Sequence, residues 1–206
     1  MDKEEKIKEK NKKWFDEWAD SYDWFFLKRL LNYWQDKAIG ELTGREKRIL
    51  EVSYGTGSTL GKIAKKFSKA AIYGIDISPN MKKEAEKKLR KFRKVKLFVS
   101  DVGKMLFKDN YFDFIFSTES FHHYPNGEKA IKEMARVLKK EGKLVIVDIN
   151  LKPIWLFNFL FKLEPGFVHL YSQKEMRELF ERYGIKMIKQ ERCGIFAVKN
   201  SGIKFT

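Results

Sequence analysis

The residues best suited to chemistry lie between Glu51 and Asp76, in a pattern that can hold a nucleoside. An apolar run, Arg48 to Val52, leads into a loop with Gly55 and Gly57, and a helical pattern follows. Glycines let the backbone turn sharply and approach a ligand closely, and the helix N-terminus offers unpaired N–H groups. Asp76 follows after about twenty residues, the spacing at which a carboxylate can bind a ribose diol. The combination predicts a nucleoside-containing cofactor, whereas an ordinary turn would explain the glycines alone.

Two other nucleotide-binding patterns fit this loop poorly. The dinucleotide fingerprint has its third glycine three residues after the second, but Leu60 stands there and Gly61 follows it. A triphosphate-binding loop needs Gly-Lys-Ser/Thr, and here Gly61-Lys62 precedes Ile63. The spacing therefore disfavours a nicotinamide-dependent reductase, which remains an alternative on the same general fold.

The loop resembles the first motif of the class I S-adenosylmethionine-dependent methyltransferases. That motif runs acid-x-Gly-x-Gly-x-Gly and corresponds to Glu51-Val-Ser-Tyr-Gly-Thr-Gly57, with Ser53 in place of the first glycine. The segment from Arg136 to Asp148 resembles the family's next helix, glycine turn and fifth strand. The chain is most similar to small-molecule enzymes of the ubiquinone and menaquinone biosynthesis type.

This resemblance implies S-adenosylmethionine as the cofactor and suggests how its parts are held. Glu51 would meet the methionine amino group, Asp76 the ribose and Asp101 the adenine, although an acid that caps a loop would also explain Asp101. Tyr22 belongs to an Ala-x-x-Tyr-Asp element that folds over the cofactor in the family; a core tyrosine is the alternative. The cofactor-binding residues implied are Tyr22, Glu51, Ser53, Tyr54, Gly55, Gly57, Asp76, Ile77, Asp101, Val102 and Ser117.

Two adjacent histidines, His122 and His123, follow an apolar run from Phe112 to Ser117 that predicts a central strand. Open parallel sheets bind ligands beyond the carboxyl ends of their strands, so these histidines should lie near the site. Either one could take a proton from a substrate, and packing against a neighbouring helix is the alternative. Adjacent residues of a helical turn point about a hundred degrees apart, so we expect at most one ring to face the methyl group.

The substrate is narrowed by missing motifs and by an apolar segment. No Asn/Asp-Pro-Pro-Tyr follows the fourth predicted strand, and no cysteine lies there or in the next strand, which counts against methylation of nucleic-acid bases. The segment from Lys152 to Phe161 is too short to cross a membrane. It could line a pocket, lie on a membrane surface or form a dimer contact. We favour a wall or lid of an apolar pocket, with Trp155, His169 and Tyr171 as substrate-contacting residues.

The formal net charge of +15 is concentrated in one part of the chain. Residues 62–108 contain fifteen Lys/Arg and four Asp/Glu, which gives +11 for that stretch. Such a face can attract nucleic acid or an anionic membrane. A solvated lysine-rich surface is the interpretation we favour, and an RNA-binding methyltransferase or adaptor is the alternative function.

The single cysteine, Cys193, excludes an internal disulfide and, with three histidines, argues against a structural zinc site. The N-terminus has no apolar signal region, and no stretch is long enough to span a bilayer. We therefore expect a cytoplasmic protein, monomeric or homodimeric, that uses no metal.

Five strand patterns that alternate with helices, followed by a hairpin, predict an α/β protein: a three-layer, doubly wound sandwich. The resemblance implies a seven-stranded, mostly parallel sheet of order 3-2-1-4-5-7-6 with the last strand antiparallel. We expect one methyltransferase domain over residues 1–206: a helical lid (1–40), a cofactor-binding core (45–150), a substrate-side insertion (151–171) and a last helix and hairpin (172–206). The helix before the fifth strand should end near Glu141, with Gly142 left-handed. The hairpin strands should be Ile185 to Gln190 and Ile195 to Lys199.

Overall fold

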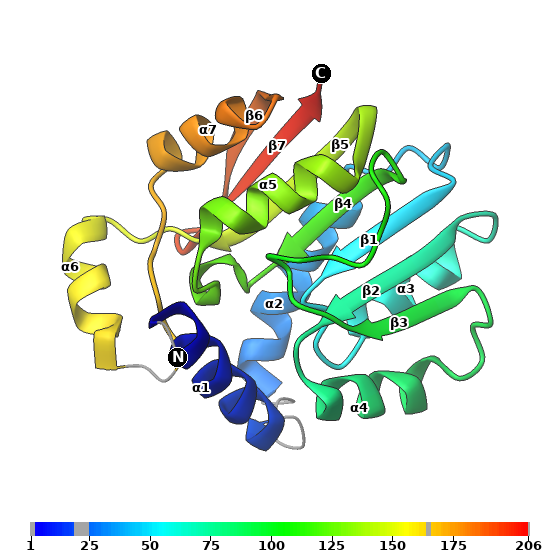
Figure 1. The fold of residues 1–206 in the computed structure, drawn as a ribbon, viewed down its shortest axis with the longest axis horizontal. Coiled ribbons are helices and arrows are strands. Elements are labelled where there is room, and N and C mark those ends of the chain that lie inside the picture. The colour runs from blue at the N-terminus through cyan, green and yellow to red at the C-terminus, as the bar shows by residue number, and fades with distance from the viewer. Residues whose placement is uncertain (1–2, 19–24, 164–165, 206) are drawn as a thin grey trace.

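The computed structural model describes residues 3–18, 25–163 and 166–205 of the chain. Its seven strands form one sheet with helices on both faces, so the described chain has three layers (Figure 1). The strands are β1 (Arg48–Val52), β2 (Ala71–Asp76), β3 (Val95–Val99), β4 (Phe112–Thr118), β5 (Leu138–Ile149), β6 (Ile185–Cys193) and β7 (Ala197–Lys204). The α-helices are α1 (Lys3–Trp18), α2 (Phe25–Ile39), α3 (Ser58–Lys66), α4 (Pro79–Leu89), α5 (Gly127–Val137), α6 (Ile154–Leu160) and α7 (Gln173–Arg182). Two 3₁₀ turns are η1 (Phe121–His123) and η2 (Phe161–Leu163).

The strand order is β3-β2-β1-β4-β5-β7-β6, as predicted. Strands β1 to β5 pair in parallel, and β7 runs antiparallel to both β5 and β6. Parallel neighbours need a crossover, which the helices provide, while the short link between β6 and β7 allows an antiparallel hairpin. The chain reverses its winding direction between β1 and β4, and open α/β sheets bind ligands beyond such a point.

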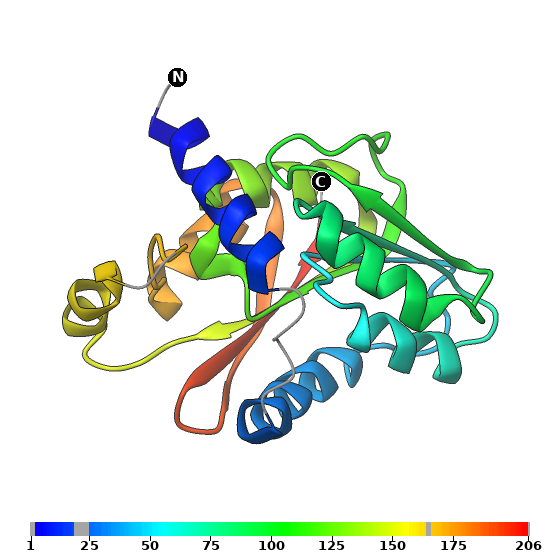
Figure 2. The same cartoon turned by 90° about the horizontal axis from the view of Figure 1, so that it is seen from below.

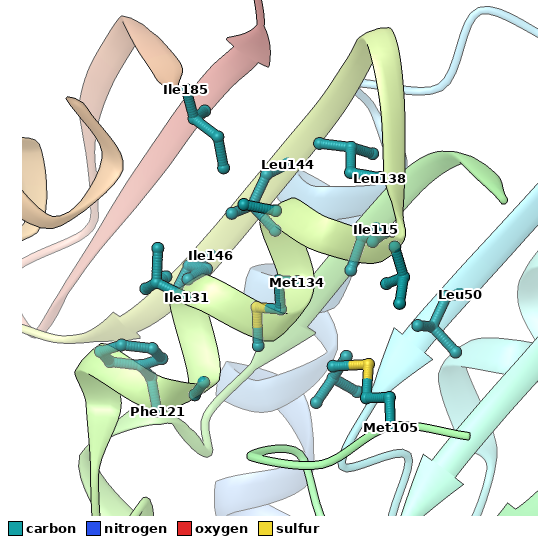
Figure 3. Close-up of a cluster of buried hydrophobic side chains, with 14 of the residues drawn as sticks. Leu50, Met105, Ile115, Phe121, Ile131, Met134, Leu138, Leu144, Ile146 and Ile185 are labelled. Carbon is teal, nitrogen blue, oxygen red and sulfur yellow. The ribbon is translucent and has the colours of Figure 1, made fainter. Parts of the chain in front are cut away.

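Alternate residues of the central strands enter two different cores, which explains their nearly continuous apolar sequence. Leu50 and Ile115 pack toward α5 and α7, in the cluster shown in Figure 3. Their chain neighbours Ile49 and Phe114 pack on the opposite face, against α2, α3 and α4. All four side chains are buried. The strands are therefore held from both sides, and their carboxyl ends form a rigid platform.

Local sequence signals set the start of two helices. The Ser78 hydroxyl accepts the Met81 N–H at the start of α4, and Pro79 occupies its first turn. Ser172 and Glu175 form a capping box at the start of α7.

The predicted end of the helix before β5 was wrong. Helix α5 ends at Val137 and β5 begins at Leu138, with a register shift against β4. Glu141, with φ 62°, takes the left-handed conformation that was expected for Gly142. Gly142 is needed for space instead, because a Cβ there would lie 2.7 Å from the Lys139 carbonyl oxygen. The residues of β5 between Leu138 and Lys143 therefore form a bulge opposite Phe112 and Phe114 of β4.

The hairpin strands also differ from the prediction, since β6 extends to Cys193 and β7 runs from Ala197 to Lys204. Polar residues of β7 are buried, so its sequence does not look like a strand. Lys199 shows the reason: its ammonium lies 2.6 Å from Glu41 Oε1 and 3.0 Å from Glu191 Oε2. Partners distant in sequence make this buried charge tolerable.

Candidate functional site

A cavity of about 820 Å³ lies beyond the carboxyl ends of the parallel strands. Residues of the loops after β1, β2, β3, β4 and β5 line it, and residues of α1 and α2 cover it. Figures 1 and 2 show α1 lying across this end of the sheet. The volume of the cavity falls in the range of about 300–1,000 Å³ that is usual for small-molecule and cofactor sites.

The two glycines of the loop between β1 and α3 have different surroundings. Gly55 borders the cavity, and Gly57 packs against α4. Both have positive φ, at 53° and 76°. A Cβ on Gly55 would meet no atom within 4 Å, whereas a Cβ on Gly57 would lie 2.8 Å from Leu89 Cδ1. Gly55 lines the cavity, and Gly57 is not among the residues that do. Gly55 thus leaves room for a ligand to approach the backbone, as the prediction requires of both glycines, whereas Gly57 lets α3 and α4 pack closely.

Asp76 joins the first two loops at the edge of the cavity. Its Oδ2 accepts the Gly55 N–H and its Oδ1 accepts the Ser78 N–H, each at 2.9 Å. Burial raises the pKa of this carboxyl to about 6, against the opposing effect of the N–H groups that stabilise its charge. The adjacent Ile77 also lines the cavity.

Glu51 points a buried carboxyl at the same cavity. It is 2% exposed, and its Oε2 has no hydrogen-bond partner among the described residues. Burial raises its pKa well above the usual range, although the Thr59 hydroxyl stabilises the charged form. An unpaired buried acceptor is costly. The site thus fits a ligand that brings a hydrogen-bond donor, as the amino group of S-adenosylmethionine would.

Asp101 and Val102, after β3, line the cavity. Asp101 Oδ2 lies 2.7 Å from the Lys8 ammonium, and its Oδ1 accepts the Gly103 N–H at 2.8 Å. The ion pair ties α1 to the loop at the adenine end implied by the family resemblance. Lys8 was not predicted as part of the site.

His122 is held by a carboxylate from β5. Its Nδ1 lies 2.7 Å from Asp148 Oδ1, and its backbone N–H donates to Asp148 Oδ2 at 2.7 Å. Both side chains are buried. Because a carboxylate accepts, Nδ1 carries the hydrogen and Nε2 is the basic atom of the ring.

His123 also lines the cavity, and its ring centroid lies 3.9 Å from that of His122. We expected at most one of the two rings to face the methyl group. Both rings line the cavity. His123 Nδ1 donates to the Gly166 carbonyl at 3.0 Å. Burial and the neighbouring His122 lower the pKa of His123 to about 3, so this ring stays neutral and is a poor base.

A buried tyrosine, Tyr124, connects the loop after β1 to the end of β4. Tyr124 Oη lies 3.0 Å from Ser53 Oγ and 2.9 Å from Ser117 Oγ. Ser53 lines the cavity, whereas Ser117, also predicted to bind the cofactor, lies behind the lining and contacts Tyr124. Tyr54 lines the cavity while its ring fills the space above Gly74, where a Cβ would lie 2.5 Å from Tyr54 Cδ1.

The three residues predicted to contact the substrate lie away from the large cavity. Trp155 is 73% exposed on α6, which projects from the sheet edge in Figure 1. His169 pairs with Glu175, and Tyr171 packs on Phe121. None of the three predicted residues lines the large cavity. The predicted lid residue Tyr22 lies outside the described residues.

Other residues of the site were missed. Leu151 and Phe161, from the insertion expected to cover the substrate, and Phe196, from the turn between β6 and β7, supply an apolar wall. Asn11 of α1 donates to the carbonyls of His123 and Gly166 at 2.8 and 3.1 Å. Glu119 and Gln35 line the cavity as well, but an acid one residue beyond a strand carries no local signal of its role.

Comparison with known proteins agrees with this geometry. Residues 50–146 match the family model described as "Methyltransferase domain". A ubiquinone/menaquinone biosynthesis C-methyltransferase from Rickettsia bellii (strain OSU 85-389) is 31% identical over 144 residues, which are 64% of this chain and 57% of that protein. The chain thus matches somewhat over half the length of this curated relative.

Two solved structures share the fold. A SAM dependent methyltransferase from Aquifex aeolicus has a TM-score of 0.73 and 24% identity, covering 91% of this chain and 97% of its own. A SAM-dependent methyltransferase from Methanosarcina mazei has a TM-score of 0.68 and 21% identity, covering 81% of this chain and 96% of its own. The domain match and the curated relative show that this chain is similar to methyltransferases, and the two solved structures show that it shares the fold of S-adenosylmethionine-dependent ones.

Proposed function

We propose that the chain is a methyltransferase that transfers the methyl group of S-adenosylmethionine to a small, partly apolar molecule. The observation that carries this proposal is one cavity that joins the glycine loop, Glu51 and Asp76 to His122, whose ring pairs with Asp148 behind it. The first set suits the cofactor and the second suits an acceptor that must lose a proton.

The cofactor residues hold their ligand by complementary polar contacts. Glu51 would take the methionine ammonium, Asp76 the ribose hydroxyls and Asp101 the adenine amino group. When bound, S-adenosylmethionine supplies an electrophilic methyl group on its sulfonium, so the protein needs mainly to orient a nucleophile and exclude water. Helices α1 and α2 over the cavity suit the second task.

His122 acts as the base in this proposal. The acceptor's O–H or N–H proton would pass to Nε2 as the acceptor atom attacks, while Asp148 stabilises the imidazolium that forms. His123, with its lowered pKa, would stay neutral and orient the site.

The lining also limits the acceptor. Leu151, Phe161 and Phe196 form an apolar wall. Among the described lining residues, Lys8 is the one Lys or Arg side chain, and it pairs with Asp101. This lining suits a partly apolar molecule better than a phosphate-rich one, so the RNA-binding alternative is disfavoured.

We further infer one domain that acts in the cytoplasm, as a monomer or homodimer, with the lid, core, insertion and hairpin boundaries given above. None of the helices that the structure describes could span a membrane.

Calorimetric titration with S-adenosylhomocysteine tests the function first, with a nicotinamide dinucleotide as control. Saturable binding of the first ligand alone is expected. Binding of the dinucleotide alone, or of neither ligand, would overturn the proposal. A screen of small acceptors against wild-type protein and His122→Ala would then identify the reaction, because only the wild type should turn over quickly.

A further inference from the structure

Helix α6 is apolar except for Asn158, and yet none of its residues is buried. Trp155 and Phe159 are 73% and 65% exposed, and Leu160 is exposed as well. A helix without a charged face is normally buried inside its protein. The outward side of α6 therefore needs a partner that the described part of the chain does not supply.

Contacts on the opposite side of α6 hold this face outward. The Asn158 amide donates to the Leu170 carbonyl at 3.1 Å, and the Leu170 N–H donates to Asn158 Oδ1 at 2.6 Å. The Phe157 ring centre lies 6.0 Å from that of Phe161. In Figure 1, α6 stands out from the edge of the molecule. A rotation of α6 that buried Trp155 would break these contacts, so the exposed face belongs to the fold.

The turn between β6 and β7 adds a second exposed apolar element. Ile195 is 74% exposed, and the Phe196 carbonyl accepts the Asn150 N–H at 2.8 Å, shortly before α6 begins. Phe196 also lines the large cavity, as do Leu151 and Phe161 on either side of α6. The segments that form the apolar cavity wall thus also carry four exposed side chains. We call these four residues the apolar rim: Trp155, Phe159, Leu160 and Ile195.

The two segments that carry the apolar rim hold positive charge only. Residues 149–162 and 192–196 contain Lys152, Lys162 and Arg192 and no Asp or Glu. All three cations are exposed. The Lys162 ammonium lies 5.9 Å from the centre of the Phe159 ring. Exposed aromatic rings beside Lys and Arg are typical of surfaces that lie in the headgroup region of an anionic bilayer.

We propose that the apolar rim docks on a lipid surface with anionic headgroups. Its aromatic side chains would enter the boundary between headgroups and acyl chains, where such rings prefer to lie. The flanking Lys152, Lys162 and Arg192 would contact the headgroups. Helix α6 has seven residues, so it would lie on the bilayer and not cross it.

A second copy of the chain is a poorer occupant of the same face. Helix α6 is only about 10 Å long, whereas a stable dimer buries about 800 Å² on each partner. A symmetric dimer would also bring the positive charges of two identical faces together. An anionic lipid surface complements those charges.

Docking would place the cavity wall of Phe161 and Phe196 next to the lipid. This consequence rests on the proposed function, because it concerns the path of the methyl acceptor. A partly apolar acceptor dissolved in the lipid would reach the cavity without first entering bulk water. The docking itself does not depend on which reaction the cavity supports.

Sedimentation of the whole chain with vesicles tests the proposal. The wild type should bind phosphatidylcholine vesicles that contain phosphatidylglycerol, and bind pure phosphatidylcholine much more weakly. Trp155→Ser should weaken binding to the anionic vesicles about tenfold. Lys152→Gln combined with Lys162→Gln should weaken it about thirtyfold. All three side chains are exposed, so the urea midpoint of each variant should match that of the wild type.

Matched controls come from the basic stretch of residues 62–108. Leu106 is 80% exposed and lies between Lys104 and Lys108 in the sequence, so Leu106→Ser removes a comparable exposed apolar side chain. Lys65→Gln combined with Lys69→Gln removes two exposed charges. Both controls should bind the anionic vesicles almost as the wild type does.

Tryptophan fluorescence reports which surface meets the lipid. Lipids brominated on their acyl chains should quench part of the fluorescence of the wild type. Trp155→Phe keeps an aromatic ring, so it should retain vesicle binding and lose most of this quenching. Retained quenching in that variant would show that another surface enters the lipid and would overturn the proposal.

Three further results would overturn it. The folded wild type would fail to bind anionic vesicles, or the control variants would lose binding while the α6 variants keep it. In the third, sedimentation velocity would show a dimer that Trp155→Ser dissociates, without vesicle binding, which would assign the face to a second copy. Titration of the same preparation with S-adenosylhomocysteine separates the two proposals. Nucleoside binding without vesicle binding defeats the docking alone, and vesicle binding without nucleoside binding defeats the proposed function alone.

Discussion

His122 and Asp148 are joined twice: ring Nδ1 to carboxylate Oδ1, and backbone N–H to carboxylate Oδ2, both at 2.7 Å. A single carboxylate from β5 therefore fixes the tautomer, the ring plane and the backbone of His122, which lies in the 3₁₀ turn after β4. Such a clamp orients a base while leaving the proton transfer to the ring.

We predict that Asp148→Asn lowers kcat about tenfold to hundredfold, because the imidazolium loses its counterion and the ring its fixed tautomer. The acidic limb of the pH–rate profile should move to lower pH, since loss of the carboxylate disfavours the protonated ring. Steady-state kinetics across pH 5–9 would check both effects. His169→Gln is the control, as His169 lies outside the cavity; an equal loss in that variant would argue against a specific role for the pair.

Substitutions of the two loop glycines should have different effects, one mainly on ligand affinity and the other mainly on the free energy of unfolding. Gly57→Ala places a Cβ 2.8 Å from Leu89 Cδ1 at a positive φ, so we expect destabilisation by about 2–4 kcal/mol. Gly55→Ala meets no atom within 4 Å, so it should cost only about 1 kcal/mol but reduce S-adenosylhomocysteine affinity. Urea unfolding and calorimetry together measure the contrast. Equal stability losses in the two variants would contradict the packing role of Gly57.

We expect cofactor binding to depend on pH because the pKa of Asp76 is raised. Its pKa is raised to about 6 in the free protein, and the charged form is the better acceptor for ribose hydroxyls. Affinity for S-adenosylhomocysteine should therefore rise between pH 5 and pH 7 and then level off. Asp76→Ala should weaken binding by about 1–3 kcal/mol and remove this rise. Identical pH profiles for the variant and the wild type would show that another group titrates.

Asn11 ties α1 to the far side of the cavity. Its amide group donates to the carbonyls of His123 and Gly166, and the residue is 5% exposed. We expect Asn11→Ala to destabilise the protein by about 1–3 kcal/mol, because the His123 carbonyl loses its Asn11 donor and the Gly166 carbonyl keeps only that of the His123 ring. Protease cleavage within α1 should also become faster. Lys12→Ala, an exposed neighbour on α1, should change neither the urea midpoint nor the cleavage rate.

Much of the fold could be predicted because its signals are local. Strands such as β4 are buried on both faces, so nearly all their residues are apolar and the strand is recognisable from a short stretch of sequence. The helix starts at Ser78 and Ser172 were predictable because a cap hydroxyl bonds an N–H only three residues away. The end of α5 was not, since pairing of β5 with β4 overrode the helix-ending tendency of Gly142.

The sequence by itself determined the sheet and the cofactor end of the site, whose loop glycines and strand-end acids have characteristic short spacings. Only the tertiary structure decided how the rest of the cavity is built. Asn11 bonds residues 112 and 155 positions away, and Glu119 meets Gln35 of a covering helix. Trp155 looked equally suited to a pocket, yet it faces outward. Which side chains of a surface segment turn inward depends on packing between elements distant in sequence, and local patterns carry no record of that packing.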